Sequence, residues 1–407
     1  MADILMIADD MTGALDSGVM LSENDIDTEV IIDRFADLTE SLRAHEAVVV
    51  NTETRHLSPC QAYEAVYQLA SSAKALGVKY LYKKTDSALR GNIGAELEAV
   101  LQATGQQTVH FAPAFPQQDR VTISGTQYIN GVPLDQSQFA QDPLNPMRNA
   151  YVPNIIATTS RVPVYRDAAP CATADPCVRL YDAATERDME AIARRALVEE
   201  KGRVFAGCAG FIGELVKLMD IQKTPGKDLN LEGPLMVFCG SMHELGLRQF
   251  ELAERAGVPR FSVETREMVE PGFWSSAAGE ALLERLRELL AQGRSFLFNT
   301  IREKDGERYP GEKLHISQKL PGAIARLVYK VLEGDEKGIP MIIGGDTLGA
   351  FLTYIGATRV RPVQELRTGV VLAETVDGKI RTPFIAKAGS FGEVTLLVDL
   401  LKSAKEA

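Results

Sequence analysis

The sequence predicts a protein of the α/β class, built from two α/β domains with mainly parallel sheets. Short apolar runs alternate with amphipathic segments along most of the 407 residues, as in βαβ units around a parallel sheet. The apolar runs are continuous, which is typical of strands that helices cover on both faces. At roughly 150 residues per domain, the length corresponds to two or three domains.

The first part of the chain contains five apolar runs that we interpret as strands. They are Ile4–Ala8, Thr28–Ile32, Ala47–Val50, Val78–Tyr82 and Thr108–Ala112. Amphipathic periodicity between them predicts helices over Cys60–Leu76 and Ile93–Ala103. The stretch from Pro113 to Arg161 has little periodicity and is rich in Pro, Gln, Asn and Gly, so we expect a long irregular loop, either mobile or functional.

Regular patterning then returns and leads to a polar segment, Gln222–Pro234, that contains two Pro and two Gly. This composition predicts a linker, so we expect domains at residues 1–230 and 231–407. The elements expected before the linker are Val178–Tyr181, Glu186–Glu199, Arg203–Cys208 and Phe211–Met219. Those after it are strands at Leu235–Cys239, Phe261–Val263, Ser295–Asn299 and Met341–Ile343, and helices at Glu244–Ala256, Ala277–Gln292 and Leu320–Leu332.

The charge balance restricts the class of ligand. Lys and Arg number 44 and Asp and Glu number 55, which gives a formal net charge of −11. Such a chain has no long-range attraction for nucleic acid or for an anionic membrane. An anionic ligand must therefore be bound by a few cations and backbone N–H groups placed close to it.

Cysteine usage and hydropathy indicate the compartment. The five cysteines are an odd number without a C-x-x-C pair, which is typical of free thiols in a reducing environment. No apolar run approaches the ~18 residues of a membrane span, and no basic leader precedes an apolar stretch at the N-terminus. We therefore expect a soluble, cytoplasmic protein.

Polar residues follow the first predicted strand. Asp9 and Asp10 come directly after it, and Thr12-Gly13 opens the next helix. Ligands in open α/β sheets bind beyond the carboxyl ends of strands. One carboxylate of the pair can cap the helix, and the other can hydrogen-bond sugar hydroxyls or accept a proton from one of them.

Two further polar segments follow strands in the same half. Tyr80–Gly94 combines the cations Lys83, Lys84 and Arg90 with Asp86 and Ser87 ahead of a helix N-terminus. These groups suit a small hydroxylated carboxylate, although a solvated run of charges is the alternative interpretation. Arg55, in Asn51–His56, can grip a carboxylate through two hydrogen bonds, or it can be an ordinary surface arginine.

The second half contains three glycine turns, each between a strand and a helix. They are Gly240–His243, Gly344–Ala350 and Lys387–Gly392. Glycine lets the backbone approach a ligand, and successive N–H groups can cradle phosphate oxygens. None has the spacing of a P-loop or of a dinucleotide fingerprint. One such turn alone is weak, but three in one domain favour a nucleotide polyphosphate.

At these residues the chain resembles the four-carbon acid sugar kinases, a family that includes D-threonate, D-erythronate and 3-oxo-tetronate kinases. The resemblance spans nearly the whole chain and is carried by Ala8–Ala14, Lys84–Asn92, Gly344–Gly349 and Lys387–Gly392. It implies an N-terminal domain that binds the sugar acid, a C-terminal domain that binds ATP, an active site in the interdomain cleft, and Mg²⁺-dependent phosphorylation of the C4 hydroxyl.

The resemblance also assigns residues. Asp10, Arg55, Lys84, Thr85, Asp86 and Ser87 match the sugar-acid contacts, and Ser241, Gly345, Asp346, Thr347, Leu348 and Gly389 match the ATP contacts. Departures from the family pattern at Thr85, Ala88 and Arg367–Ala373 leave the exact substrate open.

From these assignments we expect different residues to bind the carboxylate, the hydroxyls and the metal. Arg55, Lys84 and Arg90 would fix the carboxylate, and Asp10, Asp86 and Ser87 would hold the hydroxyls. Either Asp10 or Asp86 would accept the C4 proton, with Asp10 preferred. Asp346 would lie near the metal, and the two lobes would close on their ligands.

Other functions are less well supported. A non-catalytic sensor of sugar acids is the main alternative, but it has no need of a polyphosphate cradle. A serine hydrolase using Ser241 and His243 lacks the G-x-S-x-G frame. The five histidines show no zinc-ligand spacing, and a dehydrogenase would need a dinucleotide fingerprint. The oligomeric state, including a homo-oligomer, stays open.

Overall fold

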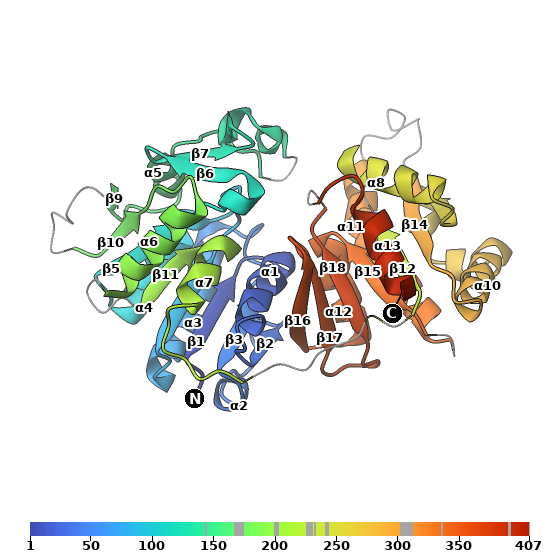
Figure 1. The fold of residues 1–407 in the computed structure, drawn as a ribbon, viewed down its shortest axis with the longest axis horizontal. Helices are drawn as coiled ribbons and strands as arrows, with labels where there is room; N and C mark the ends of the chain where they lie inside the picture. The colour runs from blue at the N-terminus through green and yellow to red at the C-terminus, as the bar shows by residue number, and fades with distance from the viewer. Residues whose placement is uncertain are drawn as a thin grey trace. The chain divides into compact units, whose positions relative to one another are not determined.

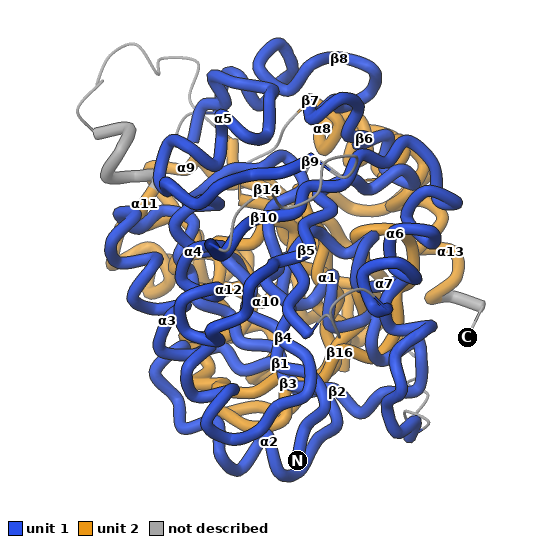
Figure 2. Tube along the Cα trace, turned by 90° about the vertical axis from the view of Figure 1, so that its left-hand side faces the viewer, with its two compact units in different colours: residues 1–226 blue, residues 227–407 orange. Residues whose placement is uncertain are grey.

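The computed structural model describes residues 1–142, 145–166, 175–198, 203–224, 231, 233–240, 244–301, 312–334, 337–389 and 392–406. The chain divides into two compact units, Met1–Gly226 and Lys227–Ala407, which Figure 2 draws in different colours. The sequence analysis places this boundary after residue 230.

The strands of unit 1 form a parallel sheet in the order β2-β3-β1-β4-β11-β5-β10-β9. The strands are β1 (Ile4–Ala8), β2 (Thr28–Ile31), β3 (Ala47–Asn51), β4 (Tyr80–Lys84), β5 (Thr108–Ala112), β9 (Val164–Arg166), β10 (Cys177–Leu180) and β11 (Val204–Gly207). The strand expected at Val78–Tyr82 is displaced toward the C-terminus. Lys84 pairs with Ala8 of β1 and Gly207 of β11, so both lysines belong to β4 rather than to the loop after it.

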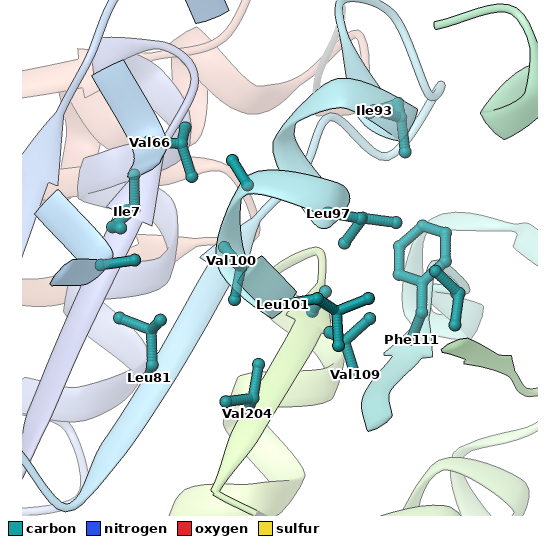
Figure 3. Packing of buried hydrophobic residues seen from close by; sticks show 14 of the residues in the cluster. Ile7, Val66, Leu81, Ile93, Leu97, Val100, Leu101, Val109, Phe111 and Val204 are labelled. Carbon is teal, nitrogen blue, oxygen red and sulfur yellow. The ribbon is translucent and has the colours of Figure 1, made fainter. Parts of the chain in front are cut away.

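Helices cover both faces of this sheet. The helices α1 (Met11–Ser22), α7 (Ala209–Val216) and α6 (Glu186–Val198) pack in a row on one face (Figure 1). The helices α3 (Pro59–Leu76), α4 (Ile93–Thr104) and α5 (Val152–Ala157) pack together on the other. In the core beneath them, Val66 of α3 and Leu97 and Val100 of α4 meet Ile7 and Leu81 of the sheet (Figure 3). Burial on both faces explains the continuous apolar runs.

The stretch expected to be irregular contains a small antiparallel sheet. It consists of β6 (Arg120–Ile123), β7 (Thr126–Ile129) and β8 (Val132–Pro133). The two turns, Ser124-Gly125 and Asn130-Gly131, have positive φ at both positions, which suits tight hairpins. The Asn-Gly pair is a hairpin signal that the sequence analysis overlooked. We call residues 116–142 the β6–β8 lobe.

Unit 2 has a mixed sheet in the order β13-β14-β12-β15-β18-β17-β16. Its strands are β12 (Leu235–Cys239), β13 (Arg260–Glu264), β14 (Phe296–Ile301), β15 (Ile339–Ile343), β16 (Arg359–Arg367), β17 (Val370–Thr375) and β18 (Pro383–Lys387). In this order, the neighbouring strands β13, β14, β12, β15 and β18 pair in parallel. The pairs β18-β17 and β17-β16 are antiparallel. The sequence analysis did not predict the β16–β17 hairpin.

The helices of unit 2 also form two layers. α8 (Glu244–Arg255) packs on α13 (Leu396–Glu406), and α11 (Glu312–Leu332) packs on α10 (Ala277–Ala291) and α12 (Gly345–Ile355). The sequence predicts that α11 begins at Leu320, but it begins at Glu312 and contains Pro321. The remaining short helices are α2 (Ser41–Ala44), α9 (Thr265–Met268), η1 (Pro116–Gln118), η2 (Leu134–Gln136), η3 (Gln138–Gln141) and η5 (Phe273–Ser275). Within the described ranges, no helix has the length and apolar character needed to cross a bilayer.

Candidate functional site

The strand register of unit 1 brings the predicted polar segments to one edge of the sheet. Ala8 at the end of β1 pairs with Asn51 of β3 and with Lys84 of β4. The chain leaves β1 through α1 on one face, whereas it leaves β3 and β4 through α3 and α4 on the other. Such a change of face between neighbouring strands marks the point where open α/β sheets bind ligands.

Arg55 joins the two aspartates that follow β1. Its Nε donates to Asp9 Oδ2 at 2.8 Å, and its Nη1 donates to Asp10 Oδ2 at 2.8 Å. Asp10 also caps α1, since its Oδ1 accepts the backbone N–H of Gly13 at 2.9 Å. Burial pushes the pKa of Asp9 upward, but Arg55 and Lys83 outweigh burial and hold that pKa below its ordinary value. Arg55 is thus a structural partner of both aspartates and not a surface arginine.

Asp86 lies in a similar clamp. Arg90 donates to its Oδ2 from Nε at 2.7 Å and to its Oδ1 from Nη2 at 3.2 Å, while Arg55 Nη2 lies 3.7 Å from Oδ1. Although burial opposes its charge, Arg90 and Arg55 keep the pKa of Asp86 far below its usual range. Arg90 donates its remaining Nη1 to Asp142 at 3.0 Å. Asp86 is therefore a weak proton acceptor, and Arg90 is already shared by two carboxylates.

Lys84 differs from these paired groups. Its side chain is buried, with 3% of the residue exposed, yet within the described part of the chain its ammonium makes no hydrogen bond and no ion pair within 4 Å. A Cβ at Gly13 would lie 2.8 Å from Lys84 Nζ and 2.6 Å from Asp10 Oδ1, so Gly13 leaves room for both groups. Buried polar groups in proteins are normally paired. An unpaired buried ammonium therefore indicates a place for an anion.

Two more buried polar atoms at this edge have no hydrogen-bond partner within the described part of the chain. They are Asp9 Oδ1 and Thr85 Oγ1. Thr85 directly follows Lys84 at the end of β4, and its backbone N–H donates to the Gly207 carbonyl at 2.8 Å. These orphaned atoms and Lys84 together offer a small ligand both a cation and hydrogen-bonding groups.

The β6–β8 lobe supplies residues that the sequence analysis did not place in the site. Arg120 of β6 donates from Nη1 to Ser87 Oγ, and Asp142 accepts from Arg90. The ring of Phe139 lies under both guanidinium groups, with 5.1 Å from Arg90 Cζ to the ring centroid and 5.7 Å from Arg120 Cζ. The Asn130-Gly131 pair was a sequence signal for a hairpin in this lobe. Nothing in the sequence indicates that the hairpin packs against Ser87 and Arg90.

Lys83 is not a ligand-facing cation. Side chains alternate along a strand, so Lys83 and Lys84 point to opposite faces of the sheet. Lys83 Nζ lies 3.1 Å from Glu96 Oε2, and both side chains are fully buried. The Thr54 hydroxyl donates to the other oxygen of Glu96. This buried pair supports the segment that carries Arg55, and it overturns the interpretation of Lys83 and Lys84 as one solvated run.

In unit 2 the three glycine turns also follow aligned strand ends. Ile343 of β15 pairs with Cys239 of β12 and with Lys387 of β18. Gly344 has φ 106° and precedes α12 without any side-chain cap. Within the described residues the N–H groups of the first turn, Gly345, Asp346 and Thr347, have no hydrogen-bond partner. They are thus available to an anion at the positive end of the helix dipole.

The side chains in the first turn of α12 differ in their solvent exposure. Asp346 is exposed, whereas Thr347 and Leu348 are buried, so Leu348 can reach a ligand only through its backbone. Gly240 has no space for a Cβ, which would lie 2.5 Å from Ile324 Cδ1 of α11. Ser241 and His243 lie outside the described residues.

Lys387 lies at the third turn and is almost fully buried. Its Nζ donates to the Ala388 carbonyl at 3.1 Å and to the Gly389 carbonyl at 3.5 Å. Burial lowers the pKa of Lys387 to about 8. The sequence analysis named Gly389 and not Lys387 as a candidate ligand residue.

A divalent metal would depend mainly on its nucleotide. Among the described residues, no three His, Cys, Asp or Glu side chains gather into a metal site. Mg²⁺ commonly binds through one or two carboxylates together with substrate phosphates and water. The exposed Asp346 in the first turn of α12 fits this limited role.

Comparisons with known proteins match a different family model to each half of the chain. Residues 4–215 match a family model described as a sugar-binding N-terminal domain, and residues 236–397 match one described as a nucleotide-binding C-terminal domain. A D-threonate kinase of Salmonella typhimurium is 29% identical over 99% of this chain and 98% of its own length. A D-erythronate kinase of Heliobacterium modesticaldum is 26% identical over 96% of this chain and 94% of its own.

A solved structure adds evidence on the fold. A protein of Salmonella typhimurium LT2 superposes with a TM-score of 0.80 over 98% of both chains, at 21% identity. The family models together cover most of the chain, and the first alone covers more than half of it. The chain therefore belongs to the four-carbon acid sugar kinase family, whose members join a sugar-binding N-terminal domain to a nucleotide-binding C-terminal domain.

Proposed function

We propose that this protein is an ATP-dependent kinase that phosphorylates the C4 hydroxyl of a four-carbon sugar acid. The observation that carries the proposal is the buried, unpaired ammonium of Lys84 beside Asp10, in the unit that matches the sugar-binding model. Full-length relatives named as kinases support a phosphotransferase over a non-catalytic sensor. The substrate is threonate, erythronate or 3-oxo-tetronate, and the product is its 4-phosphate.

Lys84 is the cation that binds the carboxylate of the sugar acid. Arg55 and Arg90 were expected to share this task, but both already hold carboxylates of the protein. In our proposal they act as positioning residues that fix Asp10 and Asp86. Ser87 and Thr85 lie beside them with hydroxyls that can bind the substrate, although Ser87 already accepts a hydrogen bond from Arg120.

Asp10 is the proposed acceptor of the C4 proton. Its side chain is 20% exposed, compared with 9% for Asp86, and it carries one arginine contact where Asp86 has two. As the C4 oxygen bonds to the γ-phosphorus, the hydroxyl proton passes to the Asp10 carboxylate and ADP leaves. Phosphoryl transfer depends mainly on positioning and charge neutralisation, so one modest base is sufficient.

The nucleotide phosphates would bind to the glycine turns of unit 2. The free N–H groups of Gly345, Asp346 and Thr347 and the turn at Gly389 are the donors we assign to them, with Ser241 from the first turn. Asp346 would hold Mg²⁺, which neutralises charge on the phosphates when bound.

The test is a coupled assay of ADP release with D-threonate, L-threonate, D-erythronate, L-erythronate and 3-oxo-tetronate. We expect sugar-acid-dependent ADP release with at least one member, and a phosphate ester at C4 of the product by phosphorus NMR. Reactions without sugar acid, and with a four-carbon acid that lacks the C4 hydroxyl, are the controls. Absence of turnover with every member of the panel would overturn the proposed function.

A further inference from the structure

One carboxylate near the proposed sugar-acid site has no role in the function described so far. Asp16 lies on α1, and its buried Oδ1 has no hydrogen-bond partner among the residues that the structure describes. Asp9, Asp10 and Asp86 are each bonded to an arginine, and Glu96 is bonded to Lys83. Asp16 therefore resembles Lys84, a residue that is 3% exposed and whose ammonium forms no ion pair within 4 Å among the described residues.

Asp16 and Lys84 lie close together but do not bond. Lys84 Nζ lies against Gly13, and Asp16 follows Gly13 by three positions, so both lie on the same side of α1. Burial raises the pKa of Asp16, and Lys84 is the charge that most strongly opposes this rise. Among the described residues there is no ion pair within 4 Å between them. A ligand that offers both an anion and a hydrogen-bond donor can satisfy both groups.

A hydroxy acid has this combination, because its carboxylate and its secondary hydroxyls are held a few bonds apart. An ionised carboxylate only accepts hydrogen bonds, so it can bind a hydroxyl but not a ketone oxygen. Sites built to hydrogen-bond a substrate hydroxyl reject analogues that lack the donor, because a buried polar group is then left unpaired.

We propose that Asp16 is a specificity-determining residue that accepts a hydrogen bond from the C3 hydroxyl of the sugar acid whose carboxylate Lys84 binds. The proposal rests on the proposed function and narrows its substrate. The site prefers a tetronate that carries a hydroxyl at both C2 and C3 over a 3-oxo acid.

The experiment compares wild type with Asp16→Asn, whose amide can donate to a ketone as well as accept from a hydroxyl. The kcat/KM is measured for D-threonate, D-erythronate and 3-oxo-tetronate, together with the KM for ATP. We expect kcat/KM for the preferred hydroxy acid to fall by about 10-fold, because a neutral amide oxygen accepts a weaker hydrogen bond than a carboxylate. The preference over 3-oxo-tetronate should shrink in parallel, and the KM for ATP should stay the same.

Controls separate folding from specificity. Asp220→Asn alters a fully exposed aspartate of the same unit and should leave every ratio unchanged. If Asp16→Asn has a lowered unfolding temperature, Asp16→Glu serves as a second variant, since it keeps an acceptor-only group and should retain the preference for hydroxy acids.

The outcomes are distinguishable. A wild-type enzyme that acts on none of the panel overturns the proposed function and this inference with it. A wild type that is active, but whose substrate ratios are the same in Asp16→Asn, overturns the inference alone. A wild type that prefers 3-oxo-tetronate also overturns the inference while leaving the kinase function intact.

Discussion

The strand ends proposed to bind the two substrates differ in chemistry between the two units. In unit 1 this edge is made of charged side chains, and Arg55 and Arg90 hold Asp9, Asp10, Asp86 and Asp142 in place. In unit 2 the corresponding edge is made of glycine turns and of helix N–H groups that have no partner among the described residues, and the buried Lys387 donates to the backbone carbonyls of Ala388 and Gly389.

Under the proposed function, this contrast follows from the ligand that each edge would bind. A phosphate presents several equivalent oxygens, so backbone N–H groups suffice to bind it. A sugar acid must be distinguished from its stereoisomers, which requires side chains whose positions are fixed in advance. Substitutions in unit 1 should therefore change the choice and turnover of the sugar acid, whereas the nucleotide site should depend on backbone geometry.

The largest effect is expected from Asp10→Ala. Loss of a proton acceptor in phosphoryl or acyl transfer typically costs on the order of 10²–10⁴-fold in rate. The change also removes the cap of α1 and one partner of Arg55. Turnover should fall by orders of magnitude, while calorimetry should show ATP binding close to that of wild type. A variant that retains wild-type kcat would remove Asp10 from the mechanism.

The adjacent lysines of β4 provide a matched pair. Lys84→Met removes an unpaired charge, so the KM for the sugar acid should rise by about 10-fold to 100-fold without loss of stability. Lys83→Met leaves Glu96 buried without its partner, which should cost about 3–5 kcal/mol in the free energy of unfolding. Steady-state kinetics and urea denaturation measure the two effects. Equal loss of stability in both variants would contradict the distinction between a binding lysine and a structural one.

Glycine substitutions compare the two units directly. A Cβ at Gly13 would collide with Asp10 Oδ1 and Lys84 Nζ, whereas a Cβ at Gly349 in α12 would meet nothing within 4 Å. Gly13→Ala should raise the KM for the sugar acid by roughly 10-fold through displacement of these groups. Gly349→Ala should leave kinetics unchanged and stabilise α12 by up to about 1 kcal/mol. Similar kinetic behaviour in both variants would argue against the close packing at Gly13.

The smallest effect concerns the pH dependence of stability in unit 2. Because burial lowers the pKa of Lys387 to about 8, the folded chain loses this proton before the unfolded chain, whose lysine has the ordinary value of 10.5. Between these two values the unfolded state binds more protons, so stability should rise with pH. Below pH 8 both states are charged and the folded state bears the full cost of burial.

Lys387→Met tests this sign. The variant should lack the part of the rise between pH 8 and pH 10 that wild type shows, and its unfolding temperature at pH 7 should be higher by roughly 2–8 °C. The measurement is thermal denaturation across this pH range. A rise of the same size in both proteins would show that Lys387 is not its source.

The sequence predicts the layered part of the fold well. Ile4–Ala8 and Thr108–Ala112 are strands with the expected bounds, because strands buried on both faces need unbroken apolar runs. The β4 strand is shifted because its last two residues are lysines, and an apolar pattern cannot reveal a lysine that is buried by pairing with Glu96. The β7–β8 hairpin carries a local signal in Asn130-Gly131, but the packing of the β6–β8 lobe against the site depends on contacts between distant segments that local composition does not specify.

The residues of the candidate site were predictable from the sequence, but their contacts with one another were not. Asp10, Arg55, Lys84, Asp86, Ser87 and Arg90 were singled out because they follow strand ends, and the structure brings them to one edge of the sheet of unit 1. Their pairing was not predictable, since it depends on distances between β1, β3 and β4 that only the folded sheet fixes. For the same reason Arg120, Asp142 and Asp16 carried no signal as members of the site.

The β6–β8 lobe has a practical consequence. It contacts the sugar-acid residues of the proposal through the side chains of Arg120, Gln127, Asp142 and Phe139. Its first hairpin is also bonded to the segment that follows β10, where Asp182 accepts from the Gly125 N–H. An exchange of this insert between relatives, made to change which acid is accepted, would therefore have to preserve its bonds to Ser87 and Asp182.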